Sequence, residues 1–128
     1  PAGAAPPAPI AHGTVPFIAN RDKPWTGVNL TELMREHLGR PVTGLNDADA
    51  AGLAEVAFGA AKDVPGTIIV TTLGTGIGSA VIVDGTLVPN TELGHLEIDS
   101  YDAESRALAG QRNAQDLSWK KWDKRLQR

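Results

Sequence analysis

The chain has 128 residues, a formal net charge of −3 and no cysteine. This mild acidity argues against a generic nucleic-acid-binding protein, which is usually basic, and the lack of cysteine excludes disulfides and thiolate zinc sites. There is no apolar run near the roughly 20 residues of a membrane helix, and no signal-peptide pattern at the start. We therefore expect a cytoplasmic protein that binds neither nucleic acid nor membrane.

The first stretch of the chain is rich in proline and alanine. Residues 1–9 carry four prolines and no large apolar side chain, so we expect this stretch to stay outside the core, because it can bury too little surface to offset its ordering entropy. Residues 10–20 are expected to form one or two short extended segments, interrupted by Gly13 and Pro16.

The next stretch predicts a helix. Asn29 or Thr31 can cap a helix that runs to Leu38. Gly39 is placed to end it, because glycine readily takes the left-handed conformation that follows many helices. A short strand at 42–45 is expected after it.

A second, alanine-rich helix follows that strand. Either Asp47 or Asp49 can cap it, and it is expected to run through Gly59. The segment 67–73 is then the clearest strand, because it is β-branched at nearly every position, a pattern typical of a strand buried on both faces.

The rest of the chain predicts a hairpin and two helices. A strand at 79–83 pairs with 67–73 across a glycine-rich turn, and Asp84-Gly85 leads into a returning strand at 86–88. Two polar helices are expected at about 102–112 and 116–127. The order of elements predicts a mixed α/β sheet with flanking helices.

The glycine-rich turn is a candidate phosphate site. Gly74, Gly76 and Gly78 permit positive φ and expose consecutive N–H groups, which can bind an anion. Thr72 and Thr75 add hydroxyl donors. No helix opens directly after the turn, so a Rossmann loop is excluded. A tight hairpin that needs glycine for its geometry alone is the alternative.

Two further strings carry polar side chains suited to a sugar. Asn46 and Asp47 follow a strand and begin a helix, where a carboxylate can accept a proton from a hydroxyl and an amide can bind sugar oxygens. Glu92 and His95 offer an acceptor and a donor. The alternatives are a helix-capping Asp47 and an ordinary surface or core histidine. No spacing of ligands predicts a metal site.

The tail, residues 118–128, is basic with interleaved tryptophans. We favour an amphipathic helix in which Trp119, Trp122 and Leu126 form a packing stripe. Binding of a polyanion by charge and stacking is the alternative.

Three runs taken together, residues 46–55, 71–80 and 87–99, resemble the ROK family of sugar kinases, especially its polyphosphate-using branch. The similarity extends from about His12 to the C-terminus. The resemblance implies a partial actin-like, ribonuclease H-like α/β fold.

The resemblance also implies roles for matching residues. Asp47 would take the proton from the 6-hydroxyl of glucose during phosphoryl transfer from polyphosphate or ATP, with Mg²⁺. The sugar, glucose with mannose left open, would be bound by Asn46, Asp47, Glu92, His95 and Glu104. The transferred phosphate would lie beside Thr72, Gly74, Thr75 and Gly76.

Two family segments have no counterpart here, an N-terminal Asp-x-Gly-Gly-Thr loop and a C-terminal Gly-Gly region. We therefore expect the middle of a longer, homodimeric kinase, weak or inactive by itself. Residues 1–45 would be a Pro/Ala-rich start and the end of the small domain, and 46–128 the first part of the large domain. A non-catalytic sugar-binding module derived from a ROK kinase or repressor is the alternative.

Overall fold

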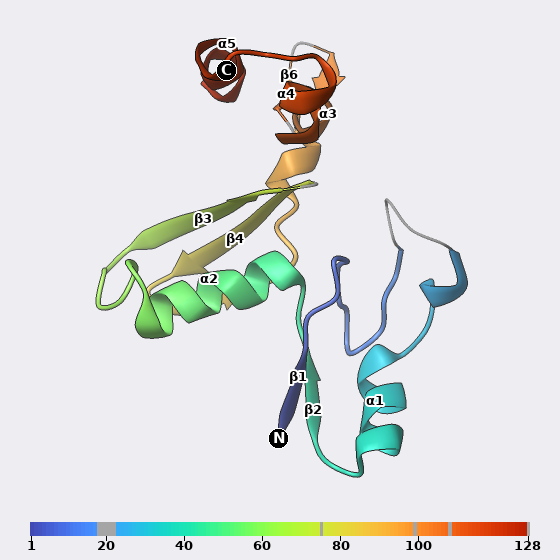
Figure 1. The fold of residues 1–128 in the computed structure, drawn as a ribbon. Coiled ribbons are helices and arrows are strands. Elements are labelled where there is room, and N and C mark those ends of the chain that lie inside the picture. Colours follow the sequence, from blue (N-terminus) through green and yellow to red (C-terminus); the bar gives the residue numbers. More distant parts are fainter. Residues whose placement is uncertain (18–22, 75, 99, 108, 128) are drawn as a thin grey trace.

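The computed structural model describes residues 1–17, 23–74, 76–98, 100–107 and 109–127. Its class is the predicted mixture of helices and strands, which gather in three groups along the molecule (Figure 1). The strands are β1 (Ala2–Ala4), β2 (Val42–Gly44), β3 (Thr67–Leu73), β4 (Ile77–Val83), β5 (Thr86–Val88), β6 (Glu97–Ile98) and β7 (Tyr101–Asp102). The helices are η1 (Lys23–Trp25), α1 (Leu30–Leu38), α2 (Asp47–Phe58), η2 (Leu93–His95), α3 (Ala103–Ala107), α4 (Ala109–Ala114) and α5 (Trp119–Leu126).

The N-terminal stretch is part of the core, so the expectation that it stays outside was wrong. Strand β1 pairs in parallel with β2, with Gly3 opposite Thr43. Further along, Ala8, Ile10 and Val15 are 3%, 9% and 1% exposed and form a buried cluster. Small side chains suffice here because β2, far along the chain, supplies the backbone partners.

The predicted extended segments at 10–20 are reduced to a turn. Ala11 and Thr14 form an isolated antiparallel bridge, and Thr14 forms another with Asn29. The part of this prediction that falls on residues 18–20 lies outside the described residues. The turn brings Val15 under α1, where Leu30 packs against the buried cluster.

Helix α1 has the predicted ends. The Asn29 side chain, rather than Thr31, caps it by accepting the Glu32 N–H at 2.9 Å. Gly39 ends it in the left-handed conformation, with φ 61°, and donates its N–H to the Arg35 carbonyl.

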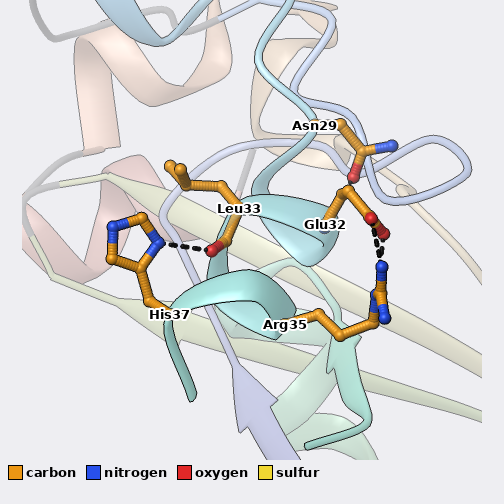
Figure 2. A network of polar contacts seen from close by, with 5 residues as sticks. All are labelled: Asn29, Glu32, Leu33, Arg35 and His37. Carbon is orange, nitrogen blue, oxygen red and sulfur yellow. Dashed lines mark hydrogen bonds and ion pairs between the residues drawn. The ribbon is translucent and has the colours of Figure 1, made fainter. Parts of the chain in front are cut away.

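The exposed face of α1 satisfies its own polar groups (Figure 2). Glu32 and Arg35 form an ion pair one turn apart. His37 places Nδ1 2.8 Å from the carbonyl oxygen of Leu33. Helix α1 therefore positions β2, and the polar side chains of its exposed face are not part of the candidate functional site described below.

Strands β3, β4 and β5 form an antiparallel sheet in that order, with Thr71 opposite Ser79. Asp84 and Gly85 both have positive φ, 47° and 79°, as the predicted two-residue hairpin requires. The expectation that β3 is buried on both faces was wrong, because Ile69 is 58% exposed. The opposite face of the sheet packs against α2, so only alternate residues of β3 are half-buried.

The C-terminal elements lie beyond the turn between β3 and β4 (Figure 1). The helix predicted at 102–112 is two helices, α3 and α4, and Ser118 caps α5 by accepting the Lys121 N–H. The hairpin of β6 and β7 was not predicted, since each strand has only two residues. Among the described residues, no helix combines the length and the apolar character needed to cross a membrane.

The contact between α2 and the sheet depends on Gly52. A Cβ atom at this position would lie 2.5 Å from the Ala80 Cβ and 3.1 Å from the Ile82 Cδ1. We expect Gly52→Val to lower the free energy of unfolding by about 1–3 kcal/mol, because the helix must move away from the strand. Urea unfolding followed by circular dichroism measures this. Ala54→Val, on the exposed side of the same helix, is the control, and an equal loss in both variants would contradict the packing role.

Candidate functional site

The N-terminus of α2 is organised by Asn46, which is 6% exposed. Its Oδ1 accepts the N–H groups of Ala48 at 2.8 Å and Asp49 at 3.3 Å. Asn46 is therefore the helix cap, and the expectation of a cap at Asp47 or Asp49 was wrong. The cap needs extended backbone, and Asn46 supplies it, with ψ 148°.

This capping leaves the carboxylate of Asp47 at the surface. Its Oδ1 accepts the N–H of Ala48, the next residue, at 2.9 Å, and its own N–H donates to the Pro6 carbonyl at 3.1 Å. The side chain thus lies at a helix N-terminus, where a negative charge is favoured. A carboxylate that is accessible in this way can accept a proton from a bound hydroxyl group.

Asn46 also reaches the second predicted string. Its Nδ2 donates to Glu92 Oε1 at 3.4 Å. Burial raises the pKa of Glu92, while nearby His95 opposes this and the carboxylates of Asp49, Asp47 and Glu104 add to it. Glu92 is therefore close enough to three other predicted sugar-binding residues, His95, Asp47 and Glu104, to be influenced by their charges.

His95 is oriented by a residue that the sequence did not point to. Its Nδ1 lies 3.1 Å from Asp102 Oδ2. This hydrogen bond raises the pKa of His95 and lowers the pKa of Asp102. Because Asp102 is an acceptor when ionised, Nδ1 carries the proton, which leaves Nε2 for another partner. Asp102 follows His95 across the β6–β7 hairpin, and no short-range pattern links the two.

The glycine-rich turn is shaped by close approach of atoms. Neither Gly74 nor Gly78 has a positive φ, so that expectation was wrong for both. A Cβ at Gly78 would lie 2.5 Å from Thr72 Oγ1 and 2.8 Å from the Ala48 Cβ, whereas one at Gly74 would meet nothing within 4 Å. Thr72 is therefore next to the start of α2, and Thr75 lies outside the described residues.

Glu104 closes the turn from the other side. Its Oε2 accepts the Ile77 N–H at 3.2 Å, and a Cβ at Gly76 would lie 3.2 Å from the same oxygen. Gly94, between Glu92 and His95, also meets the turn, since a Cβ there would lie 2.3 Å from the Ile77 carbonyl oxygen. The turn and the segment that carries Glu92 and His95 are thus in backbone contact.

Asn90, which the sequence did not single out, holds the segment that carries Glu92 and His95. Asn90, with φ 57°, donates its N–H to Asp49 Oδ2 at 2.9 Å. Its side chain accepts the Ile10 N–H at 2.9 Å and donates to the Ile10 carbonyl at 3.0 Å. Asp49 is 1% exposed, and burial raises its pKa. No local pattern could pair residues 80 positions apart.

Ser79 secures the same segment from β4. This buried hydroxyl donates to the Thr91 carbonyl and accepts the Leu93 N–H at 2.9 Å. Glu92 is therefore fixed on both sides of its own position. Within the described ranges, no group of three histidine or acidic side chains is arranged to hold a metal ion.

The structure thus brings together five of the predicted polar residues and the described part of the glycine turn. The five are Asn46, Asp47, Glu92, His95 and Glu104. The arrangement offers a free carboxylate, an amide, an imidazole nitrogen and a narrow backbone turn. Such a set can bind a polyhydroxyl compound beside an anion and accept a proton from it.

The chain is similar to known proteins along nearly all of its length. The model of the ROK family matches residues 3–115, so the similarity begins earlier than the expected His12. Polyphosphate glucokinases of Mycobacterium tuberculosis (strain CDC 1551 / Oshkosh) and Mycobacterium leprae (strain TN) are 49% and 46% identical over 100% of this chain. The matches cover 49% and 40% of those relatives, so the chain spans about half the length of the curated relatives it matches, or less.

Solved structures show the same fold. An inorganic polyphosphate/ATP-glucomannokinase from Arthrobacter sp. strain KM superposes with a TM-score of 0.90 and 55% identity, over 97% of this chain and 49% of that one. A ROK family glucokinase from Streptomyces griseus, in complex with glucose and AMPPNP, superposes with a TM-score of 0.71 and 28% identity, over 89% and 43%. The partial actin-like fold is thereby confirmed.

The His95–Asp102 pair gives a test in solution. We expect Asp102→Asn to lower the pKa of His95, because the ionised acceptor that stabilises the imidazolium is lost. The measurement is an NMR titration of the His95 ring protons, assigned with His95→Gln, with His12 and His37 as internal references. An unchanged His95 titration would contradict the pairing.

The same pair fixes the sign of a pH effect on stability. The raised pKa of His95 contributes stability that is full below its ordinary value of 6.5 and is lost as pH rises through the folded-state value. The lowered pKa of Asp102 contributes above its ordinary 3.8 and is lost as pH falls through the folded-state value. The His95–Asp102 pair is therefore expected to contribute most to stability between the ordinary pKa of Asp102, 3.8, and the ordinary pKa of His95, 6.5.

Proposed function

We propose a function for this chain, which belongs to the ROK family. It carries the sugar-binding and proton-accepting part of a glucokinase site. The observation that carries the proposal is the exposed carboxylate of Asp47, which directly follows the buried helix cap Asn46, whose side chain donates to Glu92. The names of the similar polyphosphate glucokinases support the reaction class. The reaction would transfer a phosphoryl group from polyphosphate or ATP to the 6-hydroxyl of glucose.

In this reaction Asp47 would act as the general base. As the sugar oxygen forms its bond to phosphorus, the hydroxyl proton would pass to the Asp47 carboxylate. The bond from phosphorus to the donor's bridging oxygen would break, and its electrons would stay on the leaving phosphate. Phosphoryl transfer depends mainly on positioning and charge stabilisation, so a rigid backbone around Asp47 matters as much as its basicity.

The sugar would be bound by Asn46, Glu92, His95 and Glu104. Carboxylates accept hydrogen bonds from hydroxyl groups, and the free Nε2 of His95 can accept one or donate one according to its protonation. Glu104 also holds the Ile77 N–H. The same side chain would therefore link sugar recognition to the turn. Glucose is the proposed sugar, with mannose a second substrate to be tested.

The donor's phosphate would lie by Thr72, Gly74, Thr75 and Gly76. Mg²⁺ would neutralise part of its charge. Mg²⁺ typically keeps several waters and is held by one or two carboxylates together with substrate phosphates.

The division of the chain at residues 45 and 46 forms part of the proposal, with 1–45 belonging to the small domain and 46–128 to the large one. The chain spans about half of its relatives, so the complete clamp on the donor and a homodimer would belong to a longer protein. By itself the chain would bind glucose and turn it over slowly or not at all.

The proposed function is tested by two measurements on the chain. Calorimetry with glucose is expected to show binding, and coupled detection of glucose 6-phosphate is expected to show weak or no turnover with polyphosphate or ATP. Turnover with either donor would exclude the non-catalytic sugar-binding module for this chain. The absence of any glucose binding would contradict both readings.

Asp47 can be tested separately in any sample with measurable turnover. We expect Asp47→Asn to reduce kcat by roughly 10²–10⁴-fold, because the general base is lost, while calorimetric glucose binding is retained. Asp63→Asn, at another exposed aspartate, is the matched control. Equal rates for Asp47→Asn and the unmodified chain would remove the base role.

A further inference from the structure

Positive charge is concentrated at the end of this acidic chain. Five of its twelve basic residues lie in the last twelve positions, together with only one of its fifteen acidic residues. The remainder of the chain is therefore strongly acidic. The basic stretch coincides with α5, and the proposed site uses none of its residues.

The packing stripe expected for α5 is only partly buried. Trp122 is half-buried, but Trp119 is 66% exposed and Leu126 is 36% exposed. The guanidinium of Arg112, from α4, lies 3.8 Å from the centre of the Trp119 ring, and the two tryptophan rings meet edge to face. The contact of Arg112 with Trp119 joins the start of α5 to α4, as a cation–π pair can, whereas the contact of the two tryptophans lies within α5.

This anchoring leaves the lysines of α5 at the surface. Lys120, Lys121 and Lys124 are all exposed, and none of them forms an ion pair with another described residue. Lys120 and Lys124 are four positions apart and so share one face of the helix. The single acidic side chain of the helix, Asp123, accepts a hydrogen bond from Gln127.

The position of α5 relates it to the turn. Figure 1 shows α5 at the end of the molecule where the turn between β3 and β4 lies, beyond α3 and α4. Helix α3 packs against α5 and carries Glu104, whose carboxylate meets Gly76 in the turn. The basic surface and the turn are thus joined by one short helix.

We propose that the exposed lysines of α5 (Lys120, Lys121 and Lys124) form a docking surface for an inorganic polyphosphate chain, whose reacting end would lie at the glycine turn. The choice of ligand rests on the proposed function. The surface suits a linear polyanion, because charges spaced along a helix match repeated phosphates by electrostatic attraction alone.

Fluorescence of Trp119 and Trp122 reports on this surface without any need for turnover. The protein is the full chain with Trp25→Phe, which removes the tryptophan of η1. Sodium polyphosphate of defined mean length is titrated at constant ionic strength, with pyrophosphate and single-stranded poly(U) as comparators. We expect saturable binding of polyphosphate, weaker binding of both comparators, and an affinity that falls with added salt.

Two double variants distinguish the loss of positive charge on α5 from the same loss of charge elsewhere on the chain. Lys120→Gln with Lys124→Gln is expected to weaken polyphosphate binding by roughly 10- to 30-fold, because each lysine near an anionic surface contributes several-fold. The slope of log affinity against log salt should become shallower by about one to two. Arg40→Gln with Lys62→Gln removes the same charge at exposed positions away from α5 and is expected to leave the affinity unchanged.

Three results would overturn the docking surface. They are equal weakening by the two double variants, no binding of polyphosphate at all, and binding of poly(U) as tight as that of polyphosphate. Glucose calorimetry on the same samples separates this inference from the proposed function. If the chain with Trp25→Phe alone binds glucose but not polyphosphate, only the docking surface is rejected, and if it binds polyphosphate but not glucose, only the sugar site is rejected.

Discussion

The contact on which most of the site depends is made by one asparagine. Asn90 hydrogen-bonds to both backbone polar groups of Ile10 and donates its N–H to the buried carboxylate of Asp49. A single residue thus joins the N-terminal segment, the first turn of α2 and the segment that carries Glu92 and His95. Because both partner residues, Ile10 and Asp49, are buried, leaving the polar groups of either one unpaired would cost more than the bond itself contributes.

A second constraint decides what Asp47 can do. A helix start offers several unpaired N–H groups, and the residue that satisfies them is held in place by doing so. Asn46 takes that role and is buried, which leaves its neighbour with an accessible carboxylate. The buried Asn46 carries most of the capping, whereas Asp47 accepts one N–H of the first turn and keeps its carboxylate at the surface.

The sequence predicted most elements of α1, α2 and the β3–β5 sheet, because capping residues, β-branched runs and an Asp-Gly turn act over short distances. It also predicted the residues that gather around Glu92, through the resemblance of three runs to a family. It failed to pair β1 with β2 and Ile10 with Asn90, because these partners are far apart along the chain. It also failed to pair His95 with Asp102, which are seven positions apart but follow no regular helix or strand spacing. It also failed for the exposed face of β3, since a β-branched run does not say how many layers cover it.

The backbone contact between Gly94 and Ile77 has a thermodynamic consequence. The turn and the segment that carries Glu92 and His95 have no side-chain layer between them at this point, so a displacement of one would move the other. A ligand that orders one reduces the entropy still to be lost when the other becomes ordered. Ligands bound at the two proposed positions would therefore be linked, and the linkage would be reciprocal: whatever factor the first ligand adds to the affinity for the second, the second would add to the first.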